Sequence, residues 1–202
     1  MANIGKKFEK DFINSVPTDV KVLRLNDSAG GFGSNSFLRF SLQNPYDFEL
    51  FKSPYLICLE LKTCSGNSFS FPTYNDKKEI EELKSSIYLI KDADKKKELK
   101  NQLSLKRKSI ASKNIHLHQI DGLYQSSIYK NVISGFIFNF RDKGNRTFFV
   151  DIENFLSFWK ETIKKSINLE EVSKIGIEIS STIKRTSYIY DIDLLFNKIL
   201  EV

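Results

Sequence analysis

The chain has 202 residues, of which 41% are hydrophobic and 13% aromatic, a composition that excludes a disordered or fibrous protein. We expect a single domain over residues 1–202, because a chain of this length can bury one core. No apolar run approaches the roughly 18–20 residues that span a bilayer, and the N-terminus lacks a signal peptide's hydrophobic stretch. We therefore expect a cytoplasmic protein without a membrane partner. The formal charge of +6 favours a polyanionic partner.

The first third of the sequence predicts one helix followed by strands. Apolar residues at helical spacing, from Ile4 to Ile13, place the helix at residues 4–15, and Pro17 ends it. A Gly/Ser-rich stretch indicates a loop within residues 26–44. Alternating apolar residues between turn signals predict strands at residues 20–25, 37–40, 46–51, 55–63 and 68–71.

Residues 76–113 differ in character from the rest of the chain. They contain no Gly or Pro, and carry twelve Lys or Arg against seven Asp or Glu, with apolar residues at helical spacing. Asp92-Ala93-Asp94 can cap a second helix. We therefore predict an inserted basic α-hairpin, whose charge favours contact with nucleic acid. A solvated helical surface is the alternative explanation of that charge.

The second half of the sequence predicts further helices and strands in alternation. An amphipathic helix over residues 116–129 turns Ile120, Leu123, Tyr124 and Ile128 inward. The remaining elements are a hairpin of strands at 132–140 and 146–150, a helix at 152–165, a strand at 175–179 and a closing helix at 189–200. This order predicts an α/β fold with a mixed central β-sheet flanked by helices, with the α-hairpin inserted.

Charged residues in the most apolar predicted strand suggest a catalytic site. Glu60 and Lys62 are two apart, so both point to one face of the sheet, and Asp47 stands on the preceding strand. Carboxylate oxygens hold Mg²⁺ or Mn²⁺, and a nearby lysine stabilises the charge that develops during phosphodiester hydrolysis. The alternative is a surface ion pair between Glu60 and Lys62, and spacing alone leaves both readings open.

Several motifs in order along the chain resemble one family. Pro45-Tyr46-Asp47 followed by Glu60-Leu61-Lys62 is similar to the signature of the PD-(D/E)XK nuclease superfamily. Further segments resemble the RecU-like Holliday junction resolvases of low-GC Gram-positive bacteria and their phages, and a bacterial and a phage origin both remain open. These segments are GKKFEKDF at 5–12, LELKT at 59–63, SFP at 70–72, HLHQI at 116–120, FLSFW at 155–159 and RTSYI at 185–189.

The resemblance implies a homodimeric, Mg²⁺- or Mn²⁺-dependent endonuclease that cuts branched DNA and needs no small organic cofactor. It implies Asp47, Glu60 and the carbonyl of Leu61 as metal ligands, with Lys62 positioning water or stabilising charge. It further implies that Glu9 completes the catalytic site and that Gln119 lines it. The alternatives are a restriction- or repair-type nuclease acting on duplex DNA, and a non-catalytic DNA-binding protein on the same fold.

Two segments depart from the RecU-like pattern. The family carries a long basic stalk where this chain has the shorter, Gly/Ser-rich segment 26–44, and the α-hairpin at 76–113 has no recognised counterpart. Our hypothesis is that the α-hairpin takes over part of the DNA contact, because phosphate neutralisation depends on local positive charge.

A few other polar residues are candidates for the functional surface. His116 and His118 are two apart at a predicted helix start, so we expect them to point in different directions and to serve as cap or surface residues rather than as catalysts. We predict that five cationic side chains contact DNA, and the alternative is that they form a solvated surface. They are Lys6, Arg24, Arg39, Lys184 and Arg185.

Overall fold

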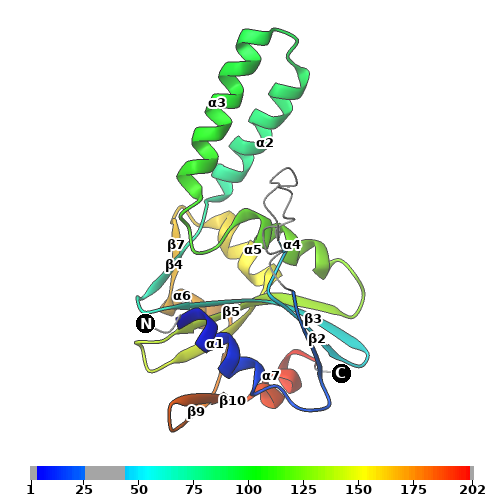
Figure 1. Ribbon diagram of the computed structural model, residues 1–202, viewed down its shortest axis with the longest axis vertical. Coiled ribbons are helices and arrows are strands. Elements are labelled where there is room, and N and C mark those ends of the chain that lie inside the picture. The colour runs from blue at the N-terminus through cyan, green and yellow to red at the C-terminus, as the bar shows by residue number, and fades with distance from the viewer. Residues whose placement is uncertain (1–3, 26–43, 201–202) are drawn as a thin grey trace, which may run out of the picture.

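A computed structural model describes residues 4–25 and 44–200 (Figure 1). The predicted strand at 37–40, most of the 26–44 segment and Arg39 lie outside these residues. The centre of the fold is a sheet with the strand order β1-β2-β3-β5-β6-β8. Its strands are β1 (Lys21–Arg24), β2 (Phe48–Lys52), β3 (Tyr55–Cys64), β5 (Val132–Phe140), β6 (Arg146–Asp151) and β8 (Ile177–Ile179).

The central sheet is mixed, as the sequence predicts. β3 and β5 run parallel, whereas every other neighbouring pair in this sheet is antiparallel. The parallel pair needs a long crossover, because parallel strands cannot be joined by a tight turn. That crossover contains strand β4 (Ser68–Ser70) and the helices α2 (Tyr74–Leu89), α3 (Ala93–Ile110) and α4 (Leu117–Ser127). The fold is therefore α/β with a mixed central sheet flanked by helices.

Helices cover both faces of this sheet, and each face has its own core. On one face, α1 (Ile4–Ile13) and α7 (Ile192–Ile199) pack against alternate residues of β3, including Leu59. On the other face, α4 and α5 (Ile152–Glu161), with α6 (Leu169–Ile175) beside them, pack over a Phe-rich core that includes Phe136 (Figure 1). Because side chains alternate along a strand, Glu60 falls on the α4 face.

Some predictions for the α4 and α5 region are wrong in detail. Tyr124 and Ile128 are exposed, whereas Ile120 and Leu123 are fully buried. The inward face of α4 is narrower than predicted, because the helix lies at the edge of the domain. The predicted helix at 152–165 ends at Glu161, where Thr162 takes an extended conformation.

The C-terminal region is more finely divided than predicted. Ile175 ends helix α6 instead of opening a strand, and the predicted helix at 189–200 begins only at Ile192. Two short antiparallel pairs were not predicted: β4 with β7 (Ser166–Asn168), and β9 (Ser181–Lys184) with β10 (Ser187–Tyr190). Strands of three or four residues are too short to show a clear alternation of apolar residues.

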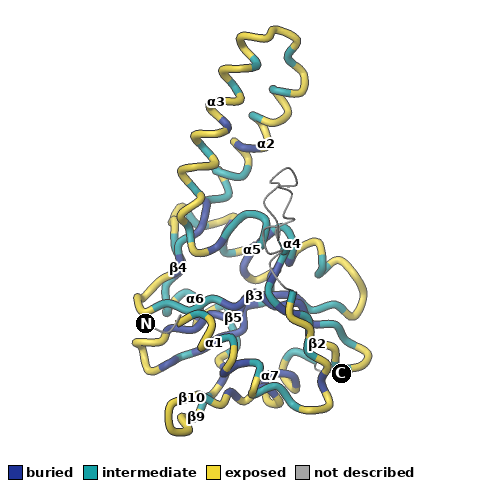
Figure 2. Tube along the Cα trace, in the orientation of Figure 1, coloured by how far each residue is buried: buried dark blue, intermediate teal, exposed yellow. Residues whose placement is uncertain are grey.

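Helices α2 and α3 form an antiparallel hairpin that projects from the body of the molecule (Figure 1). Most of its surface is exposed (Figure 2), and Ile80 and Leu103 are buried between the two helices. Asp92 caps α3 by accepting hydrogen bonds from the backbone N–H groups of Asp94 and Lys95. None of the helices in the described part of the chain has the length and apolarity needed to cross a membrane.

Candidate active site

Asp47 lies immediately before strand β2, not within the strand as predicted. Pro45 has no N–H to donate, so regular pairing cannot extend further toward the N-terminus. The Asp47 backbone is nevertheless held from both sides: its N–H donates to the carbonyl of Leu59 at 3.0 Å, and its carbonyl accepts from the N–H of Leu25 at 2.9 Å. The main chain therefore fixes where the Asp47 carboxylate can point.

The strand register places Asp47 opposite Glu60. Phe48 pairs with Leu59, so one step outward along the same antiparallel register brings Asp47 across from Glu60. The N–H of Leu61 donates to Asp47 Oδ2 at 2.8 Å. Residues directly opposite in an antiparallel pair have Cβ atoms about 4.5–5.5 Å apart. The two carboxyl groups accordingly share one side of the sheet and interact with each other.

Glu60 is an acid buried in the interior, with 2% of its surface exposed. Its Oε1 lies 2.8 Å from Lys62 Nζ and accepts a hydrogen bond from Gln119 Nε2. Its Oε2 is buried and has no hydrogen-bond partner among the described residues. Burial raises the pKa of Glu60 to about 8; Lys62 opposes this rise and Asp47 adds to it. A cation bound between Glu60 and Asp47 would neutralise both carboxylates, so this pair favours cation binding.

Gln119 connects the start of helix α4 to this carboxylate. Its side-chain Oε1 accepts from the backbone N–H of His116 at 3.0 Å, while its Nε2 donates to Glu60. One side chain therefore caps the helix and orients the acid. Composition and spacing gave no reason to choose Gln119; only the family resemblance pointed to it.

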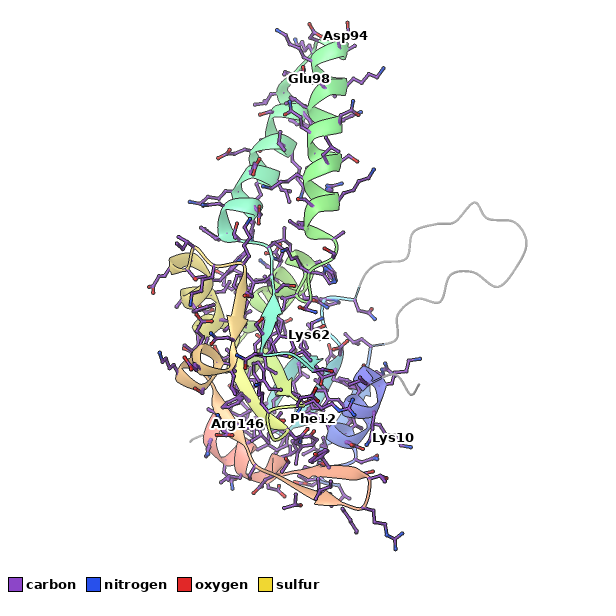
Figure 3. All side chains as sticks on the ribbon, turned by 90° about the vertical axis from the view of Figure 1, so that its left-hand side faces the viewer. Lys10, Phe12, Lys62, Asp94, Glu98 and Arg146 are labelled. Carbon is purple, nitrogen blue, oxygen red and sulfur yellow. The ribbon has the colours of Figure 1, made fainter. Side chains whose placement is uncertain are left out.

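His116 and His118 do not point in different directions, contrary to expectation. Their rings stack with centroids 5.5 Å apart and planes 10° from parallel. His116 is the N-cap residue with an extended backbone (φ −109°, ψ 152°), so helical spacing does not apply to it. Burial lowers the pKa of both imidazoles, and the positive charge of Lys62 lowers it further. The pair thus lies close enough to Lys62, which is labelled in Figure 3, for their charges to interact.

A glycine that the sequence did not single out also positions the site. A Cβ at Gly122 of α4 would lie 2.4 Å from the Cβ of Pro45 and 2.9 Å from its backbone. The absence of a side chain lets α4 press against the segment that leads directly into Asp47. No local signal could reveal this, because Pro45 and Gly122 are far apart in the sequence.

The remaining predicted residues are placed around this centre, not within it. Glu9 on α1 pairs with Arg24 on β1 (Oε2–Nη2, 2.7 Å), and Arg24 lies over the ring of Phe48, next to Asp47. Lys6 lines the same shallow pocket as Glu9 and Arg24. Lys184 and Arg185 lie at the β9–β10 turn, where Lys7 of α1 donates to the carbonyl of Thr186, on the opposite face of the sheet from Gln119.

Comparison with known proteins finds a similarity in the second half of the chain. Residues 97–193 match the family model described as "Recombination protein U", RecU, a family of Holliday junction resolvases. The chain is thus similar to RecU over a little under half of its length. It is also 32% identical over 112 residues to the "SPbeta prophage-derived uncharacterized protein YotM" of Bacillus subtilis (strain 168), covering 48% of this chain and 57% of that protein. The chain thus spans a little over half the length of this curated relative, whose prophage origin is consistent with a phage-encoded gene.

The RecU match covers only part of the candidate active site. It begins within α3 and ends in α7, so it contains Gln119 and the β5–β6 half of the sheet. Asp47, Glu60 and Lys62 precede the matched residues. Their grouping therefore stands on the geometry of β2 and β3, independently of the RecU match.

The donor set at this centre fits a divalent cation that binds through oxygen. Two carboxylates converge and one of their oxygens, Glu60 Oε2, is buried without a partner among the described residues. No cluster of three or more His, Cys, Asp or Glu side chains that could hold a metal occurs at 4–25 or 44–200. Mg²⁺ commonly binds through one or two carboxylates together with water and substrate phosphate, so two acids suffice.

Proposed function

We propose that this RecU-like chain is a divalent-metal-dependent DNA endonuclease whose catalytic centre is formed by Asp47, Glu60 and Lys62. The observation that carries the proposal is the convergence of Asp47 and Glu60 across the β2–β3 pair, with Lys62 at 2.8 Å from Glu60. Two buried or half-buried acids facing each other destabilise the fold unless a cation or proton compensates them. A catalytic role accounts for two acids held in this costly arrangement.

Asp47, Glu60 and the main-chain carbonyl of Leu61 would hold Mg²⁺ or Mn²⁺. The ion would supply a Lewis acid for the scissile phosphate and lower the pKa of a bound water. Lys62 carries its positive charge beside Glu60, where it stabilises the charge that develops on the phosphate oxygens. Gln119 holds Glu60 in place through its amide, and His116 and His118 wall the approach.

The family relationship supports branched DNA as the substrate, acted on by a homodimer. A four-way junction is resolved by two nicks in strands of like polarity, so two copies of one active site match the symmetry of the substrate. Under this proposal Glu9 helps to orient the site through Arg24, and Lys6, Arg24, Lys184 and Arg185 contact phosphate. A cytoplasmic location would give such an enzyme access to DNA.

Cleavage of matched synthetic substrates tests the substrate class. Purified protein with Mg²⁺ is given a four-way junction and the linear duplexes of its four arms, each labelled on one strand. Paired symmetric nicks in the junction, with the duplexes intact, are the expected result. Cutting of the duplexes alone would favour a restriction- or repair-type nuclease. Binding of both substrates without any cutting, in Mg²⁺ and in Mn²⁺, would favour a non-catalytic DNA-binding protein.

A further inference from the structure

A cleft lies where the α2–α3 hairpin meets helix α4. Its cationic and imidazole side chains come from three helices: Lys77 and Lys84 on α2, Arg107 on α3, and His116 and His118 at the start of α4. The backbone N–H of His116 donates to Gln119 Oε1, and Gln119 Nε2 donates to Glu60. The cleft therefore adjoins the Asp47–Glu60 centre through the first turn of α4.

The base of the hairpin is tied to the body of the molecule, so this cleft has a defined shape. Trp159 of α5 donates from Nε1 to the carbonyl of Pro72 at 2.6 Å, just before α2. Lys77 of α2 contacts Asp121 of α4. On the α3 side, the N–H of Ile115 donates to the carbonyl of Ser70 at 3.0 Å. Both ends of the hairpin are thus anchored beside the active-site face.

The cationic side of the cleft continues outward along the hairpin. Lys77 and Lys84 are seven residues apart on α2, so they share one face of that helix. Lys96 and Lys100 precede Arg107 by eleven and seven residues on α3, and Lys100 borders the same groove of α3 as Arg107. In an antiparallel pair whose contact is made by Ile80 and Leu103, these two faces lie on the same side. We call these residues, Lys77, Lys84, Lys96, Lys100 and Arg107, the basic stripe.

Three cationic side chains, Lys77, Lys84 and Arg107, line the cleft against two acidic ones, Glu81 and Asp121, and two of the three cations have no acidic partner among the described residues. Lys77 pairs with Asp121 and with Glu81, at 3.8 Å. Lys84 and Arg107 are exposed and form no ion pair with any residue in the described ranges. The cleft wall therefore carries positive charge that the protein itself leaves uncompensated, which is complementary to a polyanion.

We propose that this cleft and the basic stripe bind the sugar–phosphate backbone of one DNA arm as it leaves the Asp47–Glu60 centre. The inference rests on the proposed function for the identity of the polyanion. Lys96 and Arg107 are eleven residues apart on α3, so the stripe runs for about 16 Å at a rise of 1.5 Å per residue. A strand of duplex DNA presents roughly five phosphates over that length. His116 and His118 lie between the two sites.

Equal removal of charge at two places on the hairpin tests this proposal. The double variant Lys84→Gln/Arg107→Gln removes two cations from the cleft, and Lys91→Gln/Lys97→Gln removes two exposed cations outside the stripe. All four side chains are exposed, so both variants should fold. Binding to a four-way junction and to a duplex arm is measured in EDTA from about 50 to 200 mM salt.

The cleft variant should bind roughly tenfold more weakly, and the slope of log affinity against log salt should fall by about 1.8, for two lost phosphate contacts. The Lys91→Gln/Lys97→Gln variant should keep the wild-type slope. Equal weakening by both variants, or wild-type binding by the cleft variant, would overturn the proposal. Because binding is measured without catalysis, failure of the wild-type protein to cut DNA would count against the proposed nuclease alone.

Discussion

Glu60 is a buried acid whose environment disfavours its charged form. It is almost fully buried, one of its oxygens has no partner among the described residues, and its neighbours are an acid and a lysine. The alternation of β3 predicted that Glu60 and Lys62 share a face. Strand periodicity does not show that this face lies in the interior, or that Gln119 reaches Glu60 there. Both features depend on tertiary packing.

The pKa of Glu60 predicts how the metal-free protein responds to pH. Its folded pKa of about 8 lies above the ordinary 4.5, so folding favours the protonated acid. The stability that this group contributes is complete below pH about 4.5 and is lost as the pH rises through about 8. Urea unfolding in EDTA should therefore show a decline over this window that Glu60→Gln removes.

A second carboxyl group provides the control for this measurement. The hydrogen bonds from Arg146 lower the pKa of Glu178, so its effect on stability has the opposite sign. The Glu178→Gln variant should keep the decline between pH 4.5 and 8. A Glu60→Gln variant whose stability falls as steeply as the wild type would show that Glu60 is ionised without metal.

Gly122 provides a second prediction at the residue scale. Gly122→Ala places a Cβ within 2.4 Å of Pro45, so the Asp47 segment must move away from α4. We expect cleavage to fall more than tenfold, with a stability cost of about 1–3 kcal/mol from overpacking, offset by up to ~1 kcal/mol of helix propensity. Gly66→Ala, whose Cβ meets nothing within 4 Å, is the matched control. Full activity in Gly122→Ala would contradict the positioning role.

At the scale of elements, the long and strongly patterned segments were predictable and the short ones were not. The β5–β6 hairpin and the amphipathic α1 follow from nine- and ten-residue apolar patterns. β7, β9 and β10 have three or four residues, and their pairing is fixed by partners distant in sequence, such as β4 for β7. Asp47 lies one residue before β2 although its backbone still bonds to Leu59 and Leu25, and apolar alternation does not fix a strand boundary to one residue.

The α2–α3 hairpin is the element most readily removed. Helices α2 and α3 pack chiefly against each other, so replacing residues 78–112 by a short Gly/Ser linker should leave the body folded. Junction binding should weaken and its salt dependence should flatten, because the basic stripe is lost. Fluorescence anisotropy across a salt series measures both quantities, and circular dichroism checks the fold. Unchanged affinity and slope would show that the hairpin does not contact DNA.

At the scale of the whole molecule, the two faces of the sheet differ in what they carry. The α4 face carries Glu60, Gln119 and the two histidines, and the hairpin rises from the same side (Figure 1). The α1 face is closed by an apolar core with α7 and supports β2 and β3 from behind. Under the proposed function, the catalytic centre and the basic stripe therefore lie together on the α4 side of the molecule.

The central claim is that Asp47 and Glu60 form a catalytic metal site, and cleavage by Asp47→Asn tests it most directly. The matched control is Asp142→Asn, an exposed carboxylate in the β5–β6 turn. Both variants are compared with wild type on a four-way junction in Mg²⁺, with junction binding measured in parallel in EDTA. We predict that Asp47→Asn loses cleavage by at least a thousandfold and binds as the wild type does, while Asp142→Asn does both normally. Cleavage retained by Asp47→Asn, or binding lost together with cleavage, would contradict the claim.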